Sequence, residues 1–319
     1  MPSTSNSLKV FAGNAHPDLT KAICNYLEIE LGQAEVFKFK NDNTFVRIRE
    51  NIRQQDVFIV QPLSAPVNDH IMELLIMIDA AKRASAGRIT AVVPYYAYGR
   101  TDKKDQPRVP ITARLVADLI TVAGASRVLT VDLHAGQIQG FFNIPVDELT
   151  AMPILVEHFR ERVNDTWVVA AVDVGISKKA RDAAAKLNVP LVILEKRRMG
   201  NQDKAITVSV IGEVNGKTAL LFDDEVDTGG SMISGADELI SSGATAVYAC
   251  CTHPILSANA IGNIVASPIK EFVATDTVPV PLERGRGKIK VLSVAPLLGE
   301  AIYRIHNDLS VGAMFEIAR

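Results

Sequence analysis

Short runs of consecutive apolar residues recur along the chain, and each ends in a polar or glycine-bearing loop. The runs are rich in Val, Ile, Leu and Ala, and they are continuous rather than alternating. This pattern is typical of strands that are covered on both faces in a parallel sheet. We predict strands at 57–61, 89–94, 128–132, 167–173, 191–194 and 219–223.

Helical patterns fill the intervals between these runs. In the segment 67–83, Ile71, Leu74 and Ile78 share one apolar stripe, and Pro66 suits the opening turn of a helix. The same pattern predicts helices at 112–122, 178–187 and 231–241. Strands that alternate with helices in this way predict an open, doubly wound α/β fold.

The alternating pattern occurs twice, once before and once after roughly 145–153, although the letters themselves do not repeat. At 319 residues the chain is long for a single core. We therefore expect two tandem doubly wound parallel-sheet domains, 1–148 and 149–319, with a C-terminal segment of about 295–308 completing the first. Ligands of such sheets bind beyond the carboxyl ends of the strands, so the chemistry is expected in the loops there.

Composition narrows the class of protein. Hydrophobic residues make up 48%, charged residues 22%, and the formal net charge is -2 without a basic arm, which is typical of a soluble folded protein and argues against nucleic acid as the main partner. No run is long enough to span a membrane, and the first residues lack a secretory pattern, so we expect a cytoplasmic protein. Cys24, Cys250 and Cys251 match no zinc spacing and are expected to be buried and reduced.

The stretch LLFDDEVDTGGSM, residues 220–232, joins a carboxylate cluster to a glycine turn at the end of a predicted strand. The segment 228–231 suits a phosphate, because its N–H groups at a helix start and its two hydroxyls can donate to an anion. The upstream carboxylates would repel that phosphate on contact. A ribose phosphate resolves the conflict if Asp223 and Asp224 hold the sugar hydroxyls or a metal; the alternative is an acidic turn that only caps a helix.

Three more loops carry candidate chemistry. PYYAYGRTDKK (94–104) brings cations after an aromatic run, which suits ATP phosphates and a base, although tyrosines also line subunit contacts. VDLHAGQIQGFFNIPVDEL (131–149) has His134 near a strand end, as a metal ligand or an ordinary loop residue. EKRRMG (195–200) sets three cations in an expected loop after the strand 191–194; by itself it reads as a solvated surface cluster.

Together these segments resemble the ribose-phosphate diphosphokinase family, which has the type I phosphoribosyltransferase fold. DDEVDTGGS is similar to the phosphoribosyl-diphosphate binding motif. PYYAYGR is similar to the family signature Pro-Tyr-Tyr-x-Tyr-x-Arg-Gln-Asp, and DLHAGQIQGFF to its Asp-Leu-His-Ala-x-Gln-Ile-Gln-Gly-Phe-Phe segment. FAGNAHPDL, NDHIMELLIMIDAAKRASA, YACCTHPILS and LSVAPLLGEAI also read like family segments, so the resemblance covers nearly the whole chain.

The resemblance implies transfer of the diphosphoryl group of Mg-ATP to the anomeric hydroxyl of ribose 5-phosphate, giving AMP and 5-phosphoribosyl 1-diphosphate for nucleotide biosynthesis. It implies that His134 and Asp173 serve Mg²⁺, a hard cation that needs few protein ligands beside phosphate oxygens. It also implies that Lys196 and Arg198 are catalytic and neutralise charge on the group in flight. The implied ligands of ribose 5-phosphate are Asp223, Asp224, Asp227, Thr228, Gly229, Gly230 and Ser231, and those of ATP are Phe39, Asn41, Asn43, Arg100, Thr101 and Asp102.

The resemblance further implies a homohexamer or homodimer with the ATP site at a subunit interface, activation by inorganic phosphate and inhibition by ADP. Three positions depart from the family pattern. In FKNDN (39–43) Asn41 and Asn43 replace two acids, so we expect weaker selectivity for adenine. Thr101 replaces a glutamine and shortens a contact to adenosine, and Ile176 replaces a glycine and is expected to narrow the approach of the backbone to a diphosphate.

These departures leave other functions open. A non-catalytic regulatory subunit of the same family should lose the cationic loop, the metal histidine or the ribose aspartates, and all of them are present. A phosphoribosyltransferase predicts one α/β domain with a hood and has no use for PYYAYGR. A purely regulatory ligand-binding module would leave the cationic loop unexplained.

Overall fold

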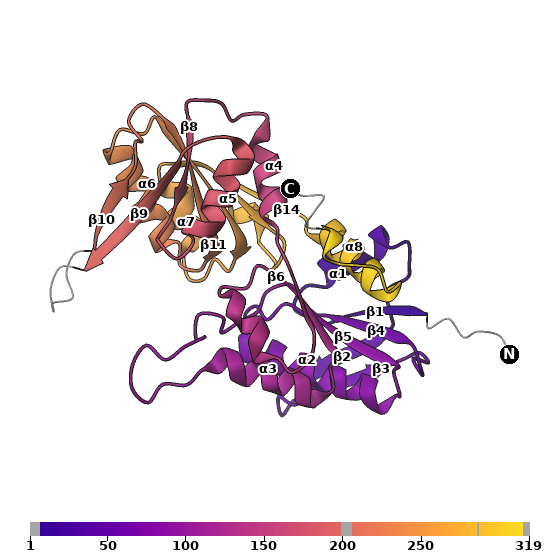
Figure 1. Cartoon of the computed structure of the whole chain (residues 1–319). Helices are drawn as coiled ribbons and strands as arrows, with labels where there is room; N and C mark the ends of the chain where they lie inside the picture. The colour runs from indigo at the N-terminus through magenta and orange to yellow at the C-terminus, as the bar shows by residue number, and fades with distance from the viewer. Residues whose placement is uncertain (1–6, 199–205, 286, 315–319) are drawn as a thin grey trace. The chain divides into compact units, whose positions relative to one another are not determined.

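Two β-sheets, both mainly parallel, form the framework of the chain in the computed structural model, which describes residues 7–198, 206–285 and 287–314 (Figure 1). They belong to two separate units. Unit 1 comprises 1–150, 277–279 and 293–319, and unit 2 comprises 151–276 and 280–292. In each unit helices flank a sheet of buried apolar strands, so the predicted α/β class with two parallel sheets is confirmed.

Unit 1 has a five-stranded parallel sheet in the order β1-β4-β5-β6-β7. Helices α2 and α3 pack together on one face, and α1 packs against α8, which returns from the C-terminal segment (Figure 1). A separate antiparallel hairpin, β2–β3, contacts α2. The bounds are β1 Leu8–Ala12, α1 Pro17–Tyr26, β2 Ala34–Lys38, β3 Thr44–Ile48, β4 Asp56–Val60, α2 Val67–Arg83, β5 Arg88–Val93, α3 Thr112–Ala123, β6 Arg127–Val131, η1 Gly136–Phe141, β7 Val146–Leu149 and α8 Ala295–His306.

Unit 2 has a seven-stranded sheet in the order β10-β9-β8-β11-β12-β13-β14, in which only the edge strand β10 is antiparallel among the described strands. Helices α4 and α5 pack on one face, and α6 and α7 pack on the other (Figure 1). The bounds are α4 Met152–Arg160, β8 Trp167–Ala171, α5 Ser177–Leu187, β9 Leu191–Arg198, β10 Ile206–Ile211, β11 Thr218–Val226, α6 Gly230–Ser241, β12 Ala246–Pro254, α7 Ala260–Ala266, β13 Ile269–Thr275, η2 Leu282–Gly285 and β14 Ile289–Leu292.

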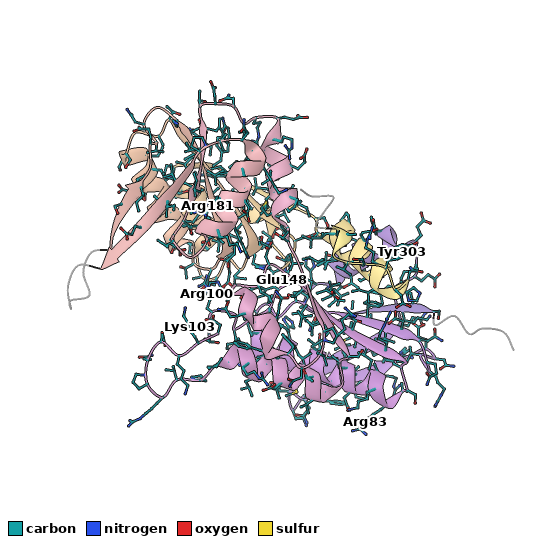
Figure 2. The ribbon with its side chains drawn as sticks, viewed as in Figure 1. Arg83, Arg100, Lys103, Glu148, Arg181 and Tyr303 are labelled. Atoms are coloured by element: carbon teal, nitrogen blue, oxygen red, sulfur yellow. The ribbon has the colours of Figure 1, made fainter. Side chains whose placement is uncertain are left out.

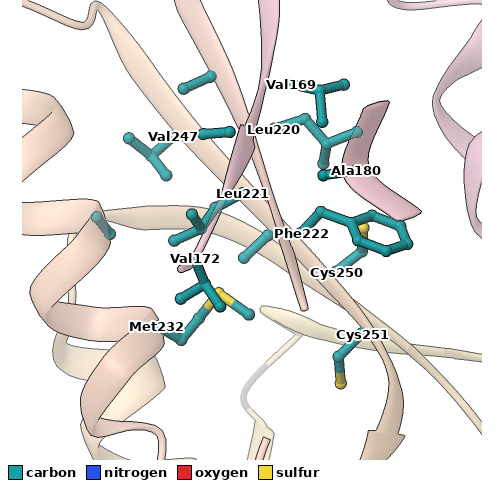
Figure 3. Packing of buried hydrophobic residues seen from close by; sticks show 14 of the residues in the cluster. Val169, Val172, Ala180, Leu220, Leu221, Phe222, Met232, Val247, Cys250 and Cys251 are labelled. Carbon is teal, nitrogen blue, oxygen red and sulfur yellow. The ribbon is translucent and has the colours of Figure 1, made fainter. Parts of the chain in front are cut away.

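The core of unit 2 lies directly beneath its acidic loop. Figure 3 shows Leu221 and Phe222 of β11 among the side chains of β12, α5 and α6. Cys250 and Cys251 of β12 pair with Phe222 and Asp223 in the parallel register, and both thiols are buried. Burial, and secondarily the charge of Asp223, raise the pKa of both thiols. They are therefore protonated, inert core residues, as the sequence predicts.

Cys24 on α1 is the third buried free thiol, and burial raises its pKa to about 11. The three cysteines are thus all packing residues. Across the described residues, every helix is too short or too polar to cross a membrane.

The predicted strands and helices are all present, and most of their ends differ by one or two residues. Two ends differ more. We expected a strand to stop at Leu194, but β9 continues to Arg198 because its backbone pairs antiparallel with β10. We expected another to stop at Asp223, but β11 continues to Val226 because β12 pairs with it up to Val226 and Pro254. Backbone pairing thus overrides the polar side chains that interrupt both apolar runs.

Candidate active site

In the sheet of unit 2, the direction in which the chain adds new strands reverses between the parallel neighbours β8 and β11. After β8 the chain adds β9 on one side, and it later places β11 on the other side of β8. The loops that follow β8 and β11 therefore leave a topological switch point, where ligands of open α/β sheets bind. Asp173 and the segment 223–231, which are expected to bind a metal and ribose 5-phosphate, lie at the carboxyl ends of these strands and in the residues that follow them.

The acidic residues lie on the part of β11 that extends past β8. Pairing with β8 ends at Phe222 and Ala171, whereas pairing with β12 continues through Asp223 and Glu225. The Asp223 carboxylate accepts a 2.9 Å hydrogen bond from the backbone N–H of Asp224. Asp224 is buried and Asp223 is half-buried. The strand therefore presents adjacent carboxylates at the switch point on a rigid, hydrogen-bonded backbone.

Asp223 lies in an acidic and largely buried environment. Its pKa is raised well above the ordinary value, first by burial, then by the negative charge of Asp224 and, further down, by that of Asp173. Asp173 follows β8 and Asp223 lies on β11, so the switch point gathers negative charge from both strands. Such a cluster is stabilised by a bound cation or by hydroxyl donors of a ligand.

The glycine turn follows directly. Gly229 adopts φ +79°, a left-handed conformation in which a glycine is favoured, and α6 begins at Gly230 without a side-chain cap from Gly229. Thr228, Gly230 and Ser231 are exposed. Exposed residues at the start of a twelve-residue helix are suited to bind an anion through backbone N–H groups.

The turn is supported from behind. A side chain on Gly229 would meet Ile233 of α6 and Ile264 and Ala260 of α7 at 3.6 to 3.9 Å. The loop after β12 binds the turn, because the N–H of Ser257 donates to the Asp227 carbonyl at 3.1 Å. The segment 227–231 is thus held by two neighbouring elements, and its outer side remains exposed.

The loop after β8 folds back on Asp173. The Asp173 carboxylate accepts a hydrogen bond from the N–H of Ile176 at 3.2 Å, just before α5 begins at Ser177. We expected the Ile176 side chain to narrow this loop. The side chain is buried in the hydrophobic core of unit 2, and its effect on the approach of the backbone to a diphosphate stays a prediction. The isoleucine therefore packs into the core while its N–H binds the Asp173 carboxylate.

Lys196 and Arg198 lie on β9, and the prediction that they occupy a loop is wrong. Their backbones pair with Val208 and Ile206 of the edge strand β10. Residues 199–205, which join the two strands, lie outside the described residues. The two cationic residues therefore belong to the backbone of the antiparallel β9–β10 pair.

Unit 1 carries the residues expected to bind ATP. Arg100 and Lys103 lie on the long loop that joins β5 to α3, and Arg100 is exposed (Figure 2). Before them, Tyr96 is buried and its hydroxyl donates to the Ala113 carbonyl at 2.8 Å. The Thr101 hydroxyl donates to the Tyr98 carbonyl at 2.7 Å. The aromatic run is thus partly a structural anchor that presents Arg100 and its neighbours.

Two hydrogen-bonded loops meet at the carboxyl ends of β5 and β6. Asp102 is buried and accepts a 2.7 Å hydrogen bond from the Gln137 side chain. A side chain on Gly99 would approach the Cβ of His134 to 3.2 Å, so these two residues pack closely. His134 itself is exposed. Asp102 therefore joins the loop that carries Arg100 to the loop that carries His134.

Phe39, Asn41 and Asn43 occupy the tip of the β2–β3 hairpin, and all three are exposed. The Asn41 side chain accepts a hydrogen bond from the N–H of Asn43 at 3.3 Å. The Phe39 ring packs against the rings of Phe37 and Phe45, with centroids 5.2 and 5.5 Å apart. The hairpin tip is thus a local structure built from an asparagine turn and an aromatic cluster.

Two acidic residues that hold these loops were not singled out from the sequence. Glu148 accepts a 2.9 Å hydrogen bond from the N–H of Leu133, beside His134. Glu73 is buried on α2 and binds Asn14 and Gln61. The signal for Glu73 was available, since it is a charged residue that falls next to Leu74 within an apolar helical pattern.

The donor chemistry fits a hard divalent cation. Carboxylate oxygens gather around Asp223 at the switch point of unit 2, and Mg²⁺ prefers such oxygens together with phosphate oxygens of a substrate. His134 belongs to unit 1 and Asp173 to unit 2. Within the described residues, no group of three or more His, Cys, Asp or Glu side chains is placed to hold a metal ion by itself.

A parallel sheet with carboxylates and a glycine turn at its switch point has the features of an α/β protein that binds a phosphorylated ligand. Comparison with known proteins identifies the family. Residues 8–124 match the model of the N-terminal domain of ribose phosphate pyrophosphokinase, and residues 179–316 match that of the phosphoribosyl synthetase-associated domain. The chain belongs to the ribose-phosphate pyrophosphokinase family.

Relatives cover the whole length. The chain is 51% identical over 316 residues to the ribose-phosphate pyrophosphokinase of Caldanaerobacter subterraneus subsp. tengcongensis, covering 99% of this chain and 100% of that protein. It is 51% identical over 311 residues to that of Rhizobium meliloti, covering 97% and 100%. The crystal structure of phosphoribosylpyrophosphate synthetase from Mycobacterium smegmatis matches with a TM-score of 0.89 at 40% identity, covering 95% of this chain and 99% of that chain.

Proposed function

We propose that this chain transfers the diphosphoryl group of ATP to the anomeric hydroxyl of ribose 5-phosphate. The hydroxyl oxygen forms a bond to the β-phosphorus of ATP, the bond from that phosphorus to the α-phosphate oxygen breaks, and AMP leaves as the hydroxyl proton is released. One observation carries the proposal: carboxylates at the end of β11 precede a glycine turn at the start of α6 within one continuous segment. Family membership supplies the reaction class.

Ribose 5-phosphate binds, in this proposal, along the segment 223–231. Thr228, Gly229, Gly230 and Ser231 bind the 5-phosphate through backbone N–H groups and hydroxyls, with Asp227 at the edge of the turn. Asp223 and Asp224 accept hydrogen bonds from the sugar hydroxyls, which is the role that adjacent carboxylates beside a phosphate turn can perform. Hydrogen-bond donors thus bind the phosphate end of the ligand, and hydrogen-bond acceptors bind its sugar hydroxyls.

ATP binds through residues of unit 1. Phe39, Asn41 and Asn43 on the hairpin would contact the base, and Arg100 and Thr101 the rest of the nucleotide. Asp102 supports this group, because its hydrogen bond to Gln137 joins the Arg100 loop to the His134 loop. Asparagine both donates and accepts hydrogen bonds, whereas a carboxylate only accepts them. Asn41 and Asn43 would therefore select adenine over other bases less strongly than two acidic residues would.

Mg²⁺ would be held by His134 and Asp173 together with phosphate oxygens, and when bound it neutralises the polyphosphate. Lys196 and Arg198 neutralise the charge that develops on the transferring group. No side chain is assigned as a general base. Catalysis in this proposal consists of positioning and charge neutralisation by groups that the two units hold in place.

The proposal extends to the assembly and its surroundings. Units 1 and 2 would act as nucleotide and sugar-phosphate domains of a cytoplasmic homohexamer or homodimer, with the ATP site at a subunit interface. Inorganic phosphate would activate the enzyme and ADP would inhibit it. Sedimentation and steady-state kinetics with each effector test these points.

An AMP-release assay tests the proposed function. Purified protein is incubated with ATP, Mg²⁺ and ribose 5-phosphate, with and without inorganic phosphate, and AMP and 5-phosphoribosyl 1-diphosphate are measured together. We expect equal amounts of both products, dependent on ribose 5-phosphate. AMP formation that is absent under all conditions would favour the regulatory subunit, and consumption of added 5-phosphoribosyl 1-diphosphate with a free base would favour a phosphoribosyltransferase.

A further inference from the structure

The first two turns of α2 bind several separate segments of unit 1. Asn68, Asp69 and Glu73 each accept hydrogen bonds or ion pairs from a different part of the chain. Two of these parts are the segments that the proposed function assigns to ATP: the loop after β5 and the β2–β3 hairpin. The third is the loop after β1. A single short stretch of helix therefore connects elements that are far apart in the sequence.

Asn68 holds the loop that carries Arg100. The Tyr98 hydroxyl donates a 2.7 Å hydrogen bond to the Asn68 side chain. Tyr98 adopts φ +62°, a left-handed conformation that is unfavourable for a side chain of this size, and it persists only where surrounding contacts enforce it. The N–H of Thr101 also donates to the Tyr98 carbonyl, at 2.9 Å. The bond to Asn68 thus helps to fix a strained residue two positions before Arg100.

Asp69 holds the hairpin that carries Phe39, Asn41 and Asn43. The Lys38 ammonium lies 2.8 Å from the Asp69 carboxylate and 2.9 Å from that of Asp42 in the hairpin turn. Hydrogen bonds to these two carboxylates raise the pKa of Lys38, so the ammonium stays charged. Lys38 therefore ties the hairpin turn to α2 next to Phe39.

Glu73 supplies a buried anchor one helical turn further on. Its carboxylate accepts hydrogen bonds from the backbone N–H of Asn14 at 2.6 Å, the Asn14 side chain at 2.8 Å and the Gln61 side chain at 2.7 Å. The Asn14 side chain also donates to the Val36 carbonyl on β2, at 3.2 Å. Removing a buried carboxylate with several donors leaves those donors unsatisfied. Through Asn14, this anchor reaches the same hairpin that Asp69 holds at its tip.

We infer that Asn68, Asp69 and Glu73 of α2 are positioning residues for ATP, which fix the Arg100 loop and the β2–β3 hairpin relative to one helix. The inference rests on the proposed function. Exposed ion pairs contribute little to stability. The ties at Asn68 and Asp69 therefore act on the placement of the two segments, whereas Glu73 contributes to folding as well.

Kinetics of Tyr98→Phe, Asn68→Ala and Asp69→Asn test the inference. We expect each variant to raise KM for ATP by about three- to tenfold, the range for one lost hydrogen bond. KM for ribose 5-phosphate and kcat should change less than about twofold, because the substituted residues lie outside the segment 223–231 that is proposed to bind ribose 5-phosphate. The ratio of activity with ATP to that with GTP should also fall, a change that a purely structural role would not produce.

Asp79→Asn is the matched control. Asp79 pairs with Arg83 at 2.7 Å on the exposed side of the same helix, and Arg83 points away from the unit (Figure 2). This variant removes a surface ion pair of the kind at Asp69 without touching either ATP segment. We expect its nucleotide KM and selectivity to match those of the unchanged protein.

Double-mutant cycles separate the two ties. Tyr98→Phe and Asn68→Ala remove the same hydrogen bond, so their combined effect on KM for ATP should equal that of either alone. Combining Tyr98→Phe with Asp69→Asn should multiply the effects, since these ties are separate. Asp69→Glu, which keeps a carboxylate for Lys38, should restore part of the affinity. Glu73→Gln is expected to lower the melting temperature as well, so it is assessed only after its folding is verified by circular dichroism.

Variants with unchanged KM for ATP and unchanged nucleotide selectivity would overturn the inference, as would equal rises of KM for ATP and for ribose 5-phosphate. Both results count only if the protein without substitutions releases AMP in the same assay. An unchanged protein without this activity would instead contradict the proposed function, so the two failures are distinguishable.

Discussion

Asp223 shows how one residue can oppose the stability of the unit that carries it. It follows Phe222, one of the largest buried side chains, and it lies beside Asp224 while Asp173 adds further negative charge. Neighbouring carboxylates at a buried strand end destabilise the fold unless a ligand neutralises them or donates to them. The residue therefore makes sense as a ligand-binding group rather than as a packing group.

The pKa of Asp223 predicts a dependence of stability on pH. Because the pKa is raised in the folded state above its ordinary 3.8, the folded protein binds this proton more tightly than the unfolded chain does. Ionisation therefore destabilises the fold, and this effect grows as the pH rises from the ordinary pKa through the raised one. Asp223→Asn should stabilise the ligand-free protein at pH 7.5 by about 1 kcal/mol, as relief of functional-site strain commonly does.

Melting temperatures of Asp223→Asn measured between pH 4 and pH 8 check this expectation, with Asp237→Asn on the exposed side of α6 as the control. The stabilisation should shrink toward low pH, while affinity for ribose 5-phosphate is lost. A destabilised Asp223→Asn protein at neutral pH would contradict the electrostatic interpretation.

His134→Ala tests the metal role of an exposed side chain in unit 1. If the imidazole helps to hold Mg²⁺, the concentration of Mg²⁺ for half-maximal AMP release should rise by about tenfold. Loss of a group that supports a metal site commonly lowers metal affinity by about this factor. KM for ribose 5-phosphate at saturating Mg²⁺ should stay unchanged, because that sugar is assigned to unit 2. Unchanged metal dependence would remove His134 from the site.

Single residues were only partly predictable from the sequence. The left-handed Gly229 follows from the TGG pattern, since few other residues tolerate that conformation. The burial of Ile176 does not, because the sequence around it leaves open which side of the loop turns toward the core. Asp102 reads like a surface acid in a charged run, yet it is buried by its bond to Gln137, a residue 35 positions away. Long-range partners of this kind leave no local signal.

At the scale of elements, the turn between β11 and α6 contains two glycines with different roles. Gly229 needs its left-handed backbone, so Gly229→Ala should lower the free energy of unfolding by about 1–2 kcal/mol. Gly230 has no positive φ, and a side chain there would meet only the Thr228 hydroxyl at 3.7 Å. Gly230→Ala should change the free energy of unfolding by less than about 0.5 kcal/mol. It should still lower the affinity for ribose 5-phosphate, because the added methyl group fills the outer side of the turn.

Urea unfolding and isothermal titration with ribose 5-phosphate measure both effects. Equal stability losses in the two variants would show that the conformation of Gly229 is not what distinguishes them. Unchanged affinity in both would argue against the turn as the phosphate site.

The end of β9 is the element expected to act on the transferring group. Lys196→Ala should lower kcat by at least about a hundredfold, the scale of one lost charge-stabilising donor. Binding of ribose 5-phosphate should be retained, since its loop follows another strand. Lys290→Ala, an exposed lysine on β14 of the same sheet, is the control. Near-normal turnover of Lys196→Ala would rule out the catalytic assignment of this strand.

The sequence predicts the elements well where apolar runs are continuous. The helix at 67–83 coincides with α2, and the strands at 57–61 and 89–94 shift by one residue. Strand ends are missed where polar residues begin, at Asp224 on β11 and at Glu195 on β9. There the hydrogen bonds to a neighbouring strand determine where the strand ends. The residues of one strand do not indicate which strand pairs with it.

At the scale of the molecule, an ion pair between the half-buried Arg88 and the buried Asp56 attaches the C-terminal helix α8 to the sheet of unit 1. Arg88 at the start of β5 donates to the buried Asp56 carboxylate at 2.8 Å and to the Ile305 carbonyl at 2.8 Å. The His306 imidazole lies 2.9 Å from the same carboxylate. Five side chains of α8 are buried: Ala295, Leu298, Ala301, Ile302 and Ile305. The chain thus returns after unit 2 to complete unit 1.

Asp56→Ala should destabilise unit 1 by about 3 kcal/mol, because it leaves the Arg88 charge without its buried partner. Calorimetry should show the transition of unit 1 moving to lower temperature, whereas titration of ribose 5-phosphate into the folded protein should be little changed. Asp79→Ala, which breaks an exposed pair, should shift the transition by less than about 0.5 kcal/mol. Equal shifts for the two variants would contradict the role of burial.

The fold class could be predicted as a whole because alternation of strands and helices is a property of the entire chain. Strand order could not. Nothing in the letters distinguishes the sequential order of unit 1 from the switched order of unit 2, although the switch point is what gathers Asp173 and Asp223. The site therefore depends on topology that arises from packing rather than from any local pattern.

The discontinuity of unit 1 has a consequence for the order in which a ribosome delivers a finished protein. The last segment of unit 2 ends at Leu292, so all of unit 2 is translated before α8. Unit 1 starts earlier but is completed by α8, which is translated after unit 2. The usual N-terminal-first order of synthesis is thereby reversed. All residues of the proposed sugar-phosphate segment are thus translated before the last element of the unit that is proposed to bind ATP.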